Sequence, residues 1–387
     1  MAGRGRSRVW REVGMVCMMV MLSAMVERVT GLIVAKDGSG DFMKLTEALN
    51  AASPGTRIIV KPGEYREKVV VTTPNIVLIG TPGQSVIVQG ESSNSAGSTL
   101  LSATFTVKAK ATGFVAMGMV FKNDYGRNDE PGEQAVAAAV MADSSFYNCQ
   151  FIGWQDTLYA KKGRQYYKDC YIEGSVDFAF GAATAQFVDC VLYAKRRGSL
   201  TIASYTAQQR LSSTDTNGYV FIGGQLKCDA GVRALLGRAW GKFARTVFIK
   251  VAMDNCIDPK GWSSVGDSNW GTTSFSAEYQ CTGPGADRSG RVSWSKVLTD
   301  EEAAYFSSPT FLGGSRSPPG GTTAVSSTPA PTKAPLEARS ESAPSSEYFS
   351  ISDEDLGSVA GPSSYEDLEP PSSEWIPMSM GSDDDQL

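Results

Sequence analysis

The chain has 387 residues, of which 42% are hydrophobic and 20% are charged, and this length allows a sizeable buried core. It contains no histidine, so Ser-His-Asp and Cys-His nucleophile systems and metal sites built on imidazole are excluded. Acid–base chemistry would therefore fall to carboxyl groups, or less commonly to Lys, Tyr or Cys. The formal net charge is −5, whereas a nucleic-acid-binding domain would be strongly basic.

The first 31 residues have the pattern of a secretory signal peptide. Arginines at positions 4, 6, 8 and 11 precede a mainly apolar run over residues 13–26, and small residues follow near Leu32. Such a run is too short to span a bilayer comfortably, and it fits the n-region and h-region of a signal. An uncleaved membrane anchor is the alternative. We expect a secreted protein without a membrane segment after cleavage, with six cysteines in an oxidising compartment.

The main domain is predicted to cover residues 32–313. It begins with short β-branched runs of strand length at 58–60, 69–71, 76–79 and 86–88. Before them, residues 41–51 are predicted to form a short amphipathic helix that closes the N-terminal end of the domain.

Three later stretches repeat with a period near 21 residues. Their cysteines, Cys149, Cys170 and Cys190, are 21 and 20 residues apart, and each lies among aromatic or β-branched residues. Helical periodicity is weak here, and repeats of one or a few short strands predict coils stacked into a parallel β-helix. Adjacent coils would lie about 4.8 Å apart. An antiparallel β-sandwich with accidental spacing is the alternative.

The same period brings polar residues together. Asp156 and Asp177 are 21 residues apart, and Gln134 precedes Asp156 by 22, so we expect the three at equivalent points of successive coils. Two carboxyl groups about 5 Å apart cannot both ionise without repulsion, so one of them should hold its proton more firmly. With Gln155 as a second amide donor, this set fits an oxyanion site for acyl transfer. Alternatively, stacked Asp and Gln residues merely cap the turns of a solenoid.

Residues 314–387 have a different composition. They hold ten of the 18 prolines, many Ser and Thr residues, and 3 basic against 13 acidic side chains, a local charge of −10. Such a segment cannot bury enough apolar surface to offset the entropy of ordering. We predict a disordered acidic C-terminal tail.

Six short motifs follow one another in a fixed order along the chain. Trp154–Leu158 is similar to a Y-Q-D-T-L box, Gly174–Gly181 to G-x-V-D-F-I-F-G, and Leu236–Trp240 to L-G-R-P-W. Together the motifs resemble the signature set of plant pectin methylesterases (pectinesterases), which are right-handed parallel β-helix enzymes. The resemblance covers about residues 33–313. The remaining motifs are Val34–Phe42, Gly63–Glu67 and Gln134–Ala138, and the chain departs from the family boxes at Ala138, Trp154, Ala179 and Ala239.

The resemblance implies hydrolysis of the methyl esters of polygalacturonate (pectin) in the cell wall, with release of methanol. Asp177 would be the nucleophile, and Asp156 the general acid and then the general base. Gln134 and Gln155 would hold the tetrahedral intermediate, and Arg238 would form hydrogen bonds with Asp177. The resemblance implies no cofactor and no metal, a monomeric enzyme, and a proteinaceous pectinesterase inhibitor as a candidate partner.

The resemblance also assigns the substrate groove and one disulfide. Trp240 would stack on a sugar face, and Phe178 and Trp262 would line the same groove. Cys170 and Cys190 match the adjacent-coil disulfide of plant family members, although Cys149 on the same ladder could compete. The pairing of the other three cysteines stays open: they are Cys228, Cys256 and Cys281.

Two other functions compete with ester hydrolysis. Paired carboxyl groups near 5 Å also suit a retaining glycosidase, although polygalacturonase motifs include a histidine and this chain has none. A calcium-dependent pectate lyase would need a cluster of Asp ligands, which the sequence does not offer. A non-catalytic wall-binding protein would be expected to lose some of the catalytic set, yet Asp156, Asp177 and Arg238 are all present.

Overall fold

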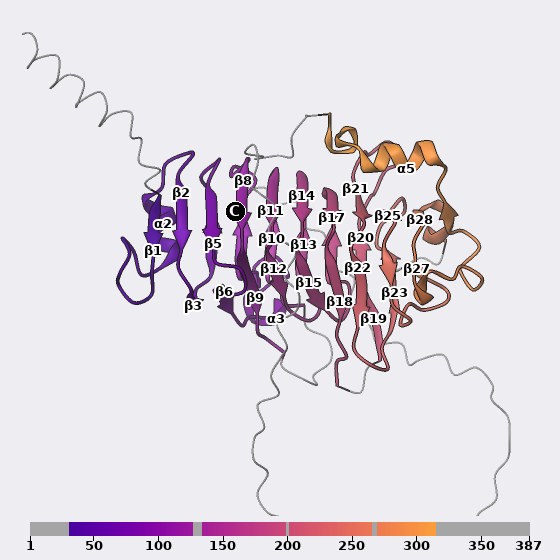
Figure 1. Ribbon diagram of the computed structural model, residues 1–387, viewed down its shortest axis with the longest axis horizontal. Helices are drawn as coiled ribbons and strands as arrows, with labels where there is room; N and C mark the ends of the chain where they lie inside the picture. The colour runs from indigo at the N-terminus through magenta and orange to yellow at the C-terminus, as the bar shows by residue number, and fades with distance from the viewer. Residues whose placement is uncertain (1–30, 127–133, 199–200, 265–268, 315–387) are drawn as a thin grey trace, which may run out of the picture. The chain divides into compact units, whose positions relative to one another are not determined.

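The computed structural model describes residues 31–126, 134–198, 201–264 and 269–314. In these ranges the chain winds into a parallel β-helix, so the predicted fold is confirmed. The coils follow one another in chain order, from β1 at one end to β28 at the other (Figure 1). The predicted signal peptide and acidic tail lie outside the described residues, apart from residues 31 and 314.

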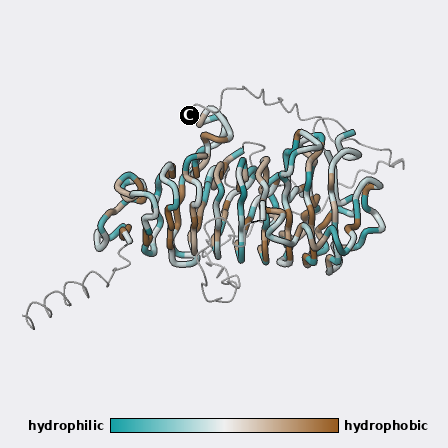
Figure 2. Tube along the Cα trace, turned by 90° about the horizontal axis from the view of Figure 1, so that it is seen from above, coloured by the Kyte–Doolittle hydropathy of each residue, from teal (hydrophilic) through white to brown (hydrophobic). Residues whose placement is uncertain are grey.

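Each central coil contributes one strand to each of three sheets. The register pairs Ala138 with Leu158, Leu158 with Ala179, and Phe146 with Tyr167, so these coils are 20 or 21 residues long, as the cysteine spacing predicted. Apolar residues recur along every coil (Figure 2). They face inward because successive side chains of a strand point to opposite faces of its sheet.

The first sheet has eleven strands within the described ranges. Their spatial order follows the chain, and from β2 to β28 every third or fourth strand joins this sheet. The strands are β1 (Leu32–Val34), β2 (Arg57–Val60), β5 (Val77–Gly80), β8 (Phe114–Met117), β11 (Ser144–Tyr147), β14 (Arg164–Lys168), β17 (Thr184–Val188), β21 (Gly218–Ile222), β25 (Arg245–Ile249), β28 (Phe275–Tyr279) and β29 (Lys296–Val297).

The second and third sheets complete the coils. In the described part of the chain the second sheet has six strands and the third has eight. The second sheet comprises β4 (Val69–Val71), β7 (Phe105–Val107), β10 (Ala138–Val140), β13 (Leu158–Ala160), β16 (Ala179–Gly181) and β20 (Thr206–Gln208). The third comprises β3 (Gly63–Arg66), β6 (Ser85–Gln89), β9 (Met119–Asn123), β12 (Gln150–Ile152), β15 (Tyr171–Gly174), β18 (Val191–Ala194), β22 (Gln225–Cys228) and β26 (Ala252–Met253).

Two small parallel pairs extend the coils near the second sheet: β19 (Ile202–Ser204) with β23 (Arg233–Leu235), and β24 (Gly237–Ala239) with β27 (Trp262–Ser264). Helices are short, and no helix in the described ranges is long and apolar enough to cross a membrane. The helical segments are α2 (Leu45–Ala51), α3 (Ser93–Ala96), α4 (Trp270–Thr273), α5 (Asp300–Ser307), and the 3-10 turns η1 (Pro284–Ala286) and η2 (Pro309–Leu312).

The predicted N-terminal helix is α2, which begins four residues later than expected. Its start is fixed by Glu67, whose carboxylate accepts hydrogen bonds from the backbone N–H groups of Leu45 and Thr46 at 2.8 and 3.0 Å. Tyr65 lies in the core, where its hydroxyl donates to the carbonyl of Lys61 at 3.0 Å. The Gly63–Glu67 motif is thus a structural element that ties the first coils to the helix.

A stack of aromatic rings runs through the core at one position of successive coils. Phe146 stacks on Tyr167 at 5.0 Å between centroids, Tyr167 on Phe187 at 4.6 Å, and Phe187 on Phe221 at 4.5 Å, all within about 11° of parallel. These separations are close to the spacing of hydrogen-bonded strands. The register of the sheet therefore sets the stacking, and these rings are almost completely buried.

A residue in the left-handed conformation turns each central coil from the first sheet to the third. Asn148, Asp169 and Asp189 have φ values of 50°, 53° and 52°. Asn and Asp tolerate this region better than other residues with a side chain. Each repeated stretch around a cysteine, such as residues 146–152, therefore belongs to two strands separated by this corner.

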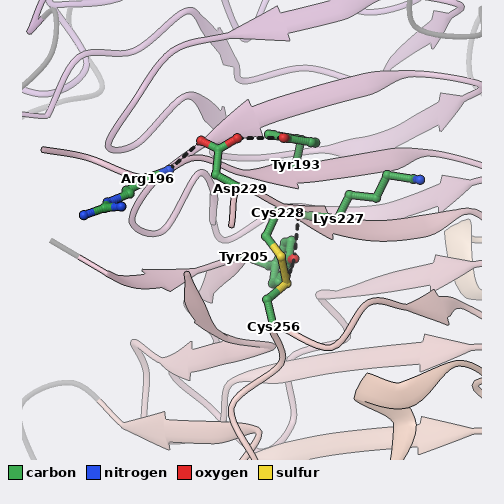
Figure 3. The surroundings of a disulfide bond; sticks show 7 residues. All are labelled: Tyr193, Arg196, Tyr205, Lys227, Cys228, Asp229 and Cys256. Atoms are coloured by element: carbon green, nitrogen blue, oxygen red, sulfur yellow. Dashed lines mark hydrogen bonds between the residues drawn. A yellow bond between two sulfur atoms is a disulfide. The ribbon is translucent and has the colours of Figure 1, made fainter. Parts of the chain in front are cut away.

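The predicted disulfide between Cys170 and Cys190 is wrong for this structure, which joins Cys228 to Cys256 (Figure 3). Cys170 and Cys190 are buried thiols that donate to backbone carbonyls of their own and preceding coils. Stacked residues keep their Cβ atoms nearly one strand spacing apart, about 4.8 Å, whereas a disulfide requires about 3.8 Å. Cys149 is also a free thiol.

Candidate functional site

The predicted site residues lie where the chain enters the strands of the second sheet. Gln134 precedes β10, Gln155 and Asp156 precede β13, and Asp177 precedes β16. Because strands of one sheet are neighbours, these three connections lie side by side.

Backbone hydrogen bonds fix which residues are level with each other. The N–H of Asp156 donates to the carbonyl of Val176 at 3.1 Å, and the N–H of Ala135 donates to that of Gln155 at 3.1 Å. In the adjoining ladder, Leu158 donates to Phe178 and is paired with the next residue, Ala179. By the same rule Asp156 is level with Asp177, and Gln134 is level with Gln155. The expectation that Gln134 is level with the two Asp residues is wrong by one position, since the residue level with Asp156 is Ala135, 21 residues before it.

Both Asp residues have a left-handed backbone, with φ of 63° at Asp156 and 51° at Asp177. Backbone strain of this kind gathers at functional sites. It also interrupts the alternation of side chains, so that each carboxyl group faces outward while the following strand resumes its inward pattern. The two carboxyl groups are thereby presented next to each other on the outer surface of the coil.

Asp177 is held by an arginine and a serine from later coils. Arg238 on β24 donates through Nε to Oδ1 at 2.9 Å and through a terminal nitrogen to Oδ2. The hydroxyl of Ser204 on β19 donates to Oδ1 at 2.5 Å. Burial disfavours the charged guanidinium of Arg238, but the charge and hydrogen bonds of Asp177 outweigh that effect and raise its pKa. This pair is a charge-assisted, bidentate contact.

Asp156 has a different environment from its neighbour. It is 5% exposed. Burial raises its pKa well above the ordinary range, and the negative charge of Asp177 raises it further, whereas Arg238 acts in the opposite direction. Asp156 therefore holds its proton more firmly than an ordinary aspartic acid side chain.

The two amides lie beside the carboxyl groups. Gln155 is 3% exposed, and Gln134 is half-buried. The hydroxyl of Ser93 on α3 donates to Oε1 of Gln134 at 2.8 Å. Because this contact occupies the amide oxygen, the NH₂ group of Gln134 is the end turned away from Ser93 and available as a donor.

A row of aromatic rings adjoins the site on the outer face of the second sheet. Tyr159 stacks on Phe180 at 4.2 Å between centroids and 14° between planes, and Trp240 lies 6.0 Å from Phe180. Tyr159 and Trp240 are half-buried. The three rings form an apolar wall of the kind on which a sugar ring can stack.

The prediction that Phe178 lines the groove is wrong. Its side chain is fully buried in the core and packs against Tyr205 at 5.4 Å between centroids. Phe180, two residues later, packs in a separate cluster with Tyr159 and Trp240 outside the core, so the side-chain alternation is interrupted between Phe178 and Phe180. Sequence reasoning missed Tyr159 and Phe180, although their separation of 21 residues repeats that of Asp156 and Asp177.

Trp262 is buried in the core but also borders a pocket. It is 2% exposed and packs against Phe248 at 5.8 Å between ring centroids, yet it also borders a pocket of about 270 Å³. The next residue, Ser263, lines the same pocket and pairs with Arg238 in the β24–β27 ladder. That Trp262 contacts a substrate stays a prediction.

The arrangement can perform acyl transfer by carboxyl groups. One carboxylate is fixed by a guanidinium, burial raises the pKa of the second carboxyl group, and two amide side chains come from the same or the adjacent connection. In the described ranges no cluster of three or more His, Cys, Asp or Glu side chains is suited to a metal ion.

Comparisons with known proteins agree with this geometry. Residues 31–315 match the family model described as Pectinesterase. The chain is 40% identical over 296 residues to a pectinesterase/pectinesterase inhibitor (number 17) of Arabidopsis thaliana, covering 73% of this chain and 57% of that protein. It is 38% identical over 301 residues to Pectinesterase 31 of the same plant, covering 72% of this chain and 91% of the relative. The structure is similar to a pectin methylesterase from carrot, with a TM-score of 0.68, 34% identity, and coverage of 73% and 93% of the two chains.

Proposed function

This chain belongs to the pectinesterase family, and from that premise we propose that its site hydrolyses the methyl esters of polygalacturonate, producing methanol and a free carboxylate. The observation that carries the proposal is the unlike pair of carboxyl groups. Asp177 is clamped by Arg238, while burial and the neighbouring charge raise the pKa of Asp156. A nucleophile and an acid are thus provided by two residues of the same type.

In the first half of the reaction, a carboxylate oxygen of Asp177 attacks the ester carbonyl carbon. The carbonyl oxygen becomes an oxyanion, which the amide NH₂ groups of Gln134 and Gln155 stabilise by hydrogen bonds. The tetrahedral intermediate collapses when its bond to the methoxy oxygen breaks. Asp156 donates its proton to that oxygen, methanol leaves, and an acyl anhydride with Asp177 remains.

In the second half, Asp156 is a carboxylate and acts as a general base. It takes a proton from a water molecule, whose oxygen attacks the galacturonyl carbonyl carbon. The bond between that carbon and the Asp177 oxygen breaks, which frees the Asp177 carboxylate and the product as a carboxylic acid, whose proton then passes to solvent. Asp156 has regained its proton, so the site returns to its starting state.

The substrate polymer is proposed to lie against the aromatic wall of Tyr159, Phe180 and Trp240. Stacking on one sugar face would hold the chain while the ester group reaches the carboxyl pair. Since such a polymer is a component of the plant cell wall, secretion through the predicted signal peptide fits this function. The name of the Arabidopsis relative joins an esterase to its inhibitor, and a proteinaceous inhibitor remains the proposed partner.

The test is product analysis on methyl-esterified pectin. The purified chain should release methanol without producing new reducing ends. New reducing ends in place of methanol would identify a glycosidase, and binding with neither product would identify a non-catalytic wall protein. The two competing functions are thereby separated by one pair of assays.

A further inference from the structure

We propose that Ser204 is a positioning residue for Asp177, holding both the backbone and the carboxylate of this one residue. Ser204 is the last residue of β19, outside every motif that pointed to the site. The kinetic part of the inference rests on the proposed function, since it concerns the residue proposed as nucleophile.

One hydroxyl makes two contacts with Asp177. The backbone N–H of Asp177 donates to Oγ of Ser204 at 2.9 Å, and the same Oγ donates to Oδ1 of Asp177 at 2.5 Å. A serine hydroxyl can accept and donate at once, so the two contacts close a ring through the main chain and side chain of Asp177. They fix its left-handed backbone and its side-chain torsions together.

The backbone of β19 makes Ser204 a rigid support. Its N–H donates to the carbonyl of Ser175 at 3.0 Å, and Ser204 pairs with Leu235 in the ladder between β19 and β23. The residues on either side, Ala203 and Tyr205, have their side chains in the core. By strand alternation Ser204 faces outward, where Asp177 covers it and leaves it 2% exposed.

The contacts also distinguish the two oxygens of Asp177. Oδ1 accepts from Ser204 and from Nε of Arg238, while Oδ2 accepts from the terminal nitrogen of Arg238. Oδ2 therefore keeps more of its lone-pair capacity for a carbonyl carbon. Without Ser204, rotation about the Cα–Cβ bond could move that oxygen even while Arg238 stays bound. The expected loss is in the chemical step rather than in polymer binding.

The experiment compares Ser204→Ala, Ser204→Thr and Ser204→Val in the full chain. Ser204→Ala should lower kcat for methanol release about 10- to 100-fold, the scale of a lost hydrogen bond to a charged group, with KM within about twofold of wild type. Ser204→Thr keeps the hydroxyl and should restore most of kcat. Ser204→Val has nearly the shape of Thr without the hydroxyl, and should resemble Ser204→Ala.

A matched control is Ser85→Ala. Ser85 is fully buried, its Oγ accepts from the N–H of Thr81 at 2.9 Å, and it donates to the carbonyl of Val60 at 2.7 Å. Its removal also costs one hydrogen bond accepted from a backbone N–H and one donated by the hydroxyl, but in the N-terminal coils, so it should lower the melting temperature and leave kcat unchanged. Wild-type kcat in Ser204→Ala, or equal kcat in the Thr and Val variants, would overturn the proposal.

A second readout does not depend on activity. Hydrogen exchange of the Asp177 amide should accelerate in Ser204→Ala and Ser204→Val and be slow in wild type and Ser204→Thr, because Oγ is its acceptor. If wild type released no methanol, the proposed function would fail. The exchange data would then decide the positioning role, and unchanged protection in Ser204→Ala would overturn it.

Discussion

The guanidinium of Arg238 contacts both carboxylate oxygens of Asp177, although the two residues are 61 positions apart in the chain. Their side chains are 21% and 12% exposed, so solvent screens the contact only weakly. The pair joins the connection before β16 to β24 and fixes the plane of the carboxylate. The predictions below follow from this contact and from its neighbours.

Asp177→Asn should abolish methanol release while the β-helix stays folded. An amide cannot act as the nucleophile, and it presents no charge to Arg238. Asn tolerates the left-handed backbone as Asp does. Asp169→Asn is the matched control, because Asp169 has nearly the same φ of 53° at a corner outside the site. Turnover by a folded Asp177→Asn protein would refute the proposed mechanism.

Gln134→Ala should lower kcat about 10²-fold, the usual effect of removing one oxyanion donor. Ser93 binds the amide oxygen of Gln134, so the donor group is the part that the substitution removes from the site. Gln225→Ala, at an exposed position of β22, should leave kcat unchanged. Equal kcat values for wild type and Gln134→Ala would exclude the oxyanion role.

The rate should depend on the protonation of Asp156. Methanol can leave only while Asp156 carries its proton, so kcat/KM should decline as pH rises through the raised pKa of this residue. Asp156→Asn removes the proton donor and should lower kcat about 10²- to 10⁴-fold. A pH–rate profile of wild type tests the first expectation, and a profile without a basic limb would contradict it.

The same substitution should stabilise the protein. The folded-state pKa of Asp156 is raised, so the folded state binds more protons than the unfolded state, and stability falls as pH rises from the unfolded pKa to the folded one. Asp156→Asn removes this penalty, which is complete above the folded pKa. Thermal melts should show a higher Tm for the variant at neutral pH and little difference at acidic pH. An equal or lower Tm at neutral pH would disprove this reading.

Phe178 and Trp240 should respond differently to truncation. Phe178→Ala empties a core position and should cost about 3–5 kcal/mol of unfolding free energy, with KM nearly unchanged. Trp240→Ala should raise KM for pectin about tenfold, equivalent to about 1.4 kcal/mol, with a smaller effect on stability because the ring is half-buried. Chemical denaturation and steady-state kinetics on both variants separate the two roles. A raised KM in Phe178→Ala, with KM unchanged in Trp240→Ala, would place Phe178 in the groove after all.

The Cys228–Cys256 disulfide should make the stability of the protein sensitive to reductant. Cys228 and Cys256 are 28 residues apart, and closing a loop of that length stabilises the fold by about 3–4 kcal/mol in the chain-entropy description. Cys228→Ser should lose this stability and become insensitive to reductant. Cys170→Ala should keep the sensitivity of wild type. If Cys170→Ala abolished it instead, the Cys170–Cys190 pairing would be correct after all.

The spacing of repeated residues was sufficient to predict the fold class and the carboxyl pair. The step between stacked cysteines and between Asp156 and Asp177 equals the register step of the ladders, because each coil is closed by the same strand spacing. A residue that repeats with the coil must therefore stack. This physical link made both the fold and the carboxyl pair predictable from one chain.

Local backbone conformation was the part that spacing could not provide. The left-handed residues at the coil corners divide the apolar runs into two strands, and the alternation of side chains is interrupted after Asp177, so that Phe178 lies in the core and Phe180 outside it. Ser204 reaches the site through a strand that no motif marked, and the disulfide joins residues from coils of unequal length. These features depend on three-dimensional closure, which a linear pattern does not encode.

The corners between the first and third sheets constrain how this chain can change in length. β11 and β12, β14 and β15, and β17 and β18 are each joined by two residues, the first left-handed. One inserted residue there would reverse the inward and outward faces of the next strand. Elsewhere the coil is open to growth: β9 ends at Asn123 and β10 begins only at Ala138. Over evolutionary time, insertions should therefore accumulate in the connection that leads to Gln134 and β10, where added residues can alter which polymer binds without unwinding the solenoid.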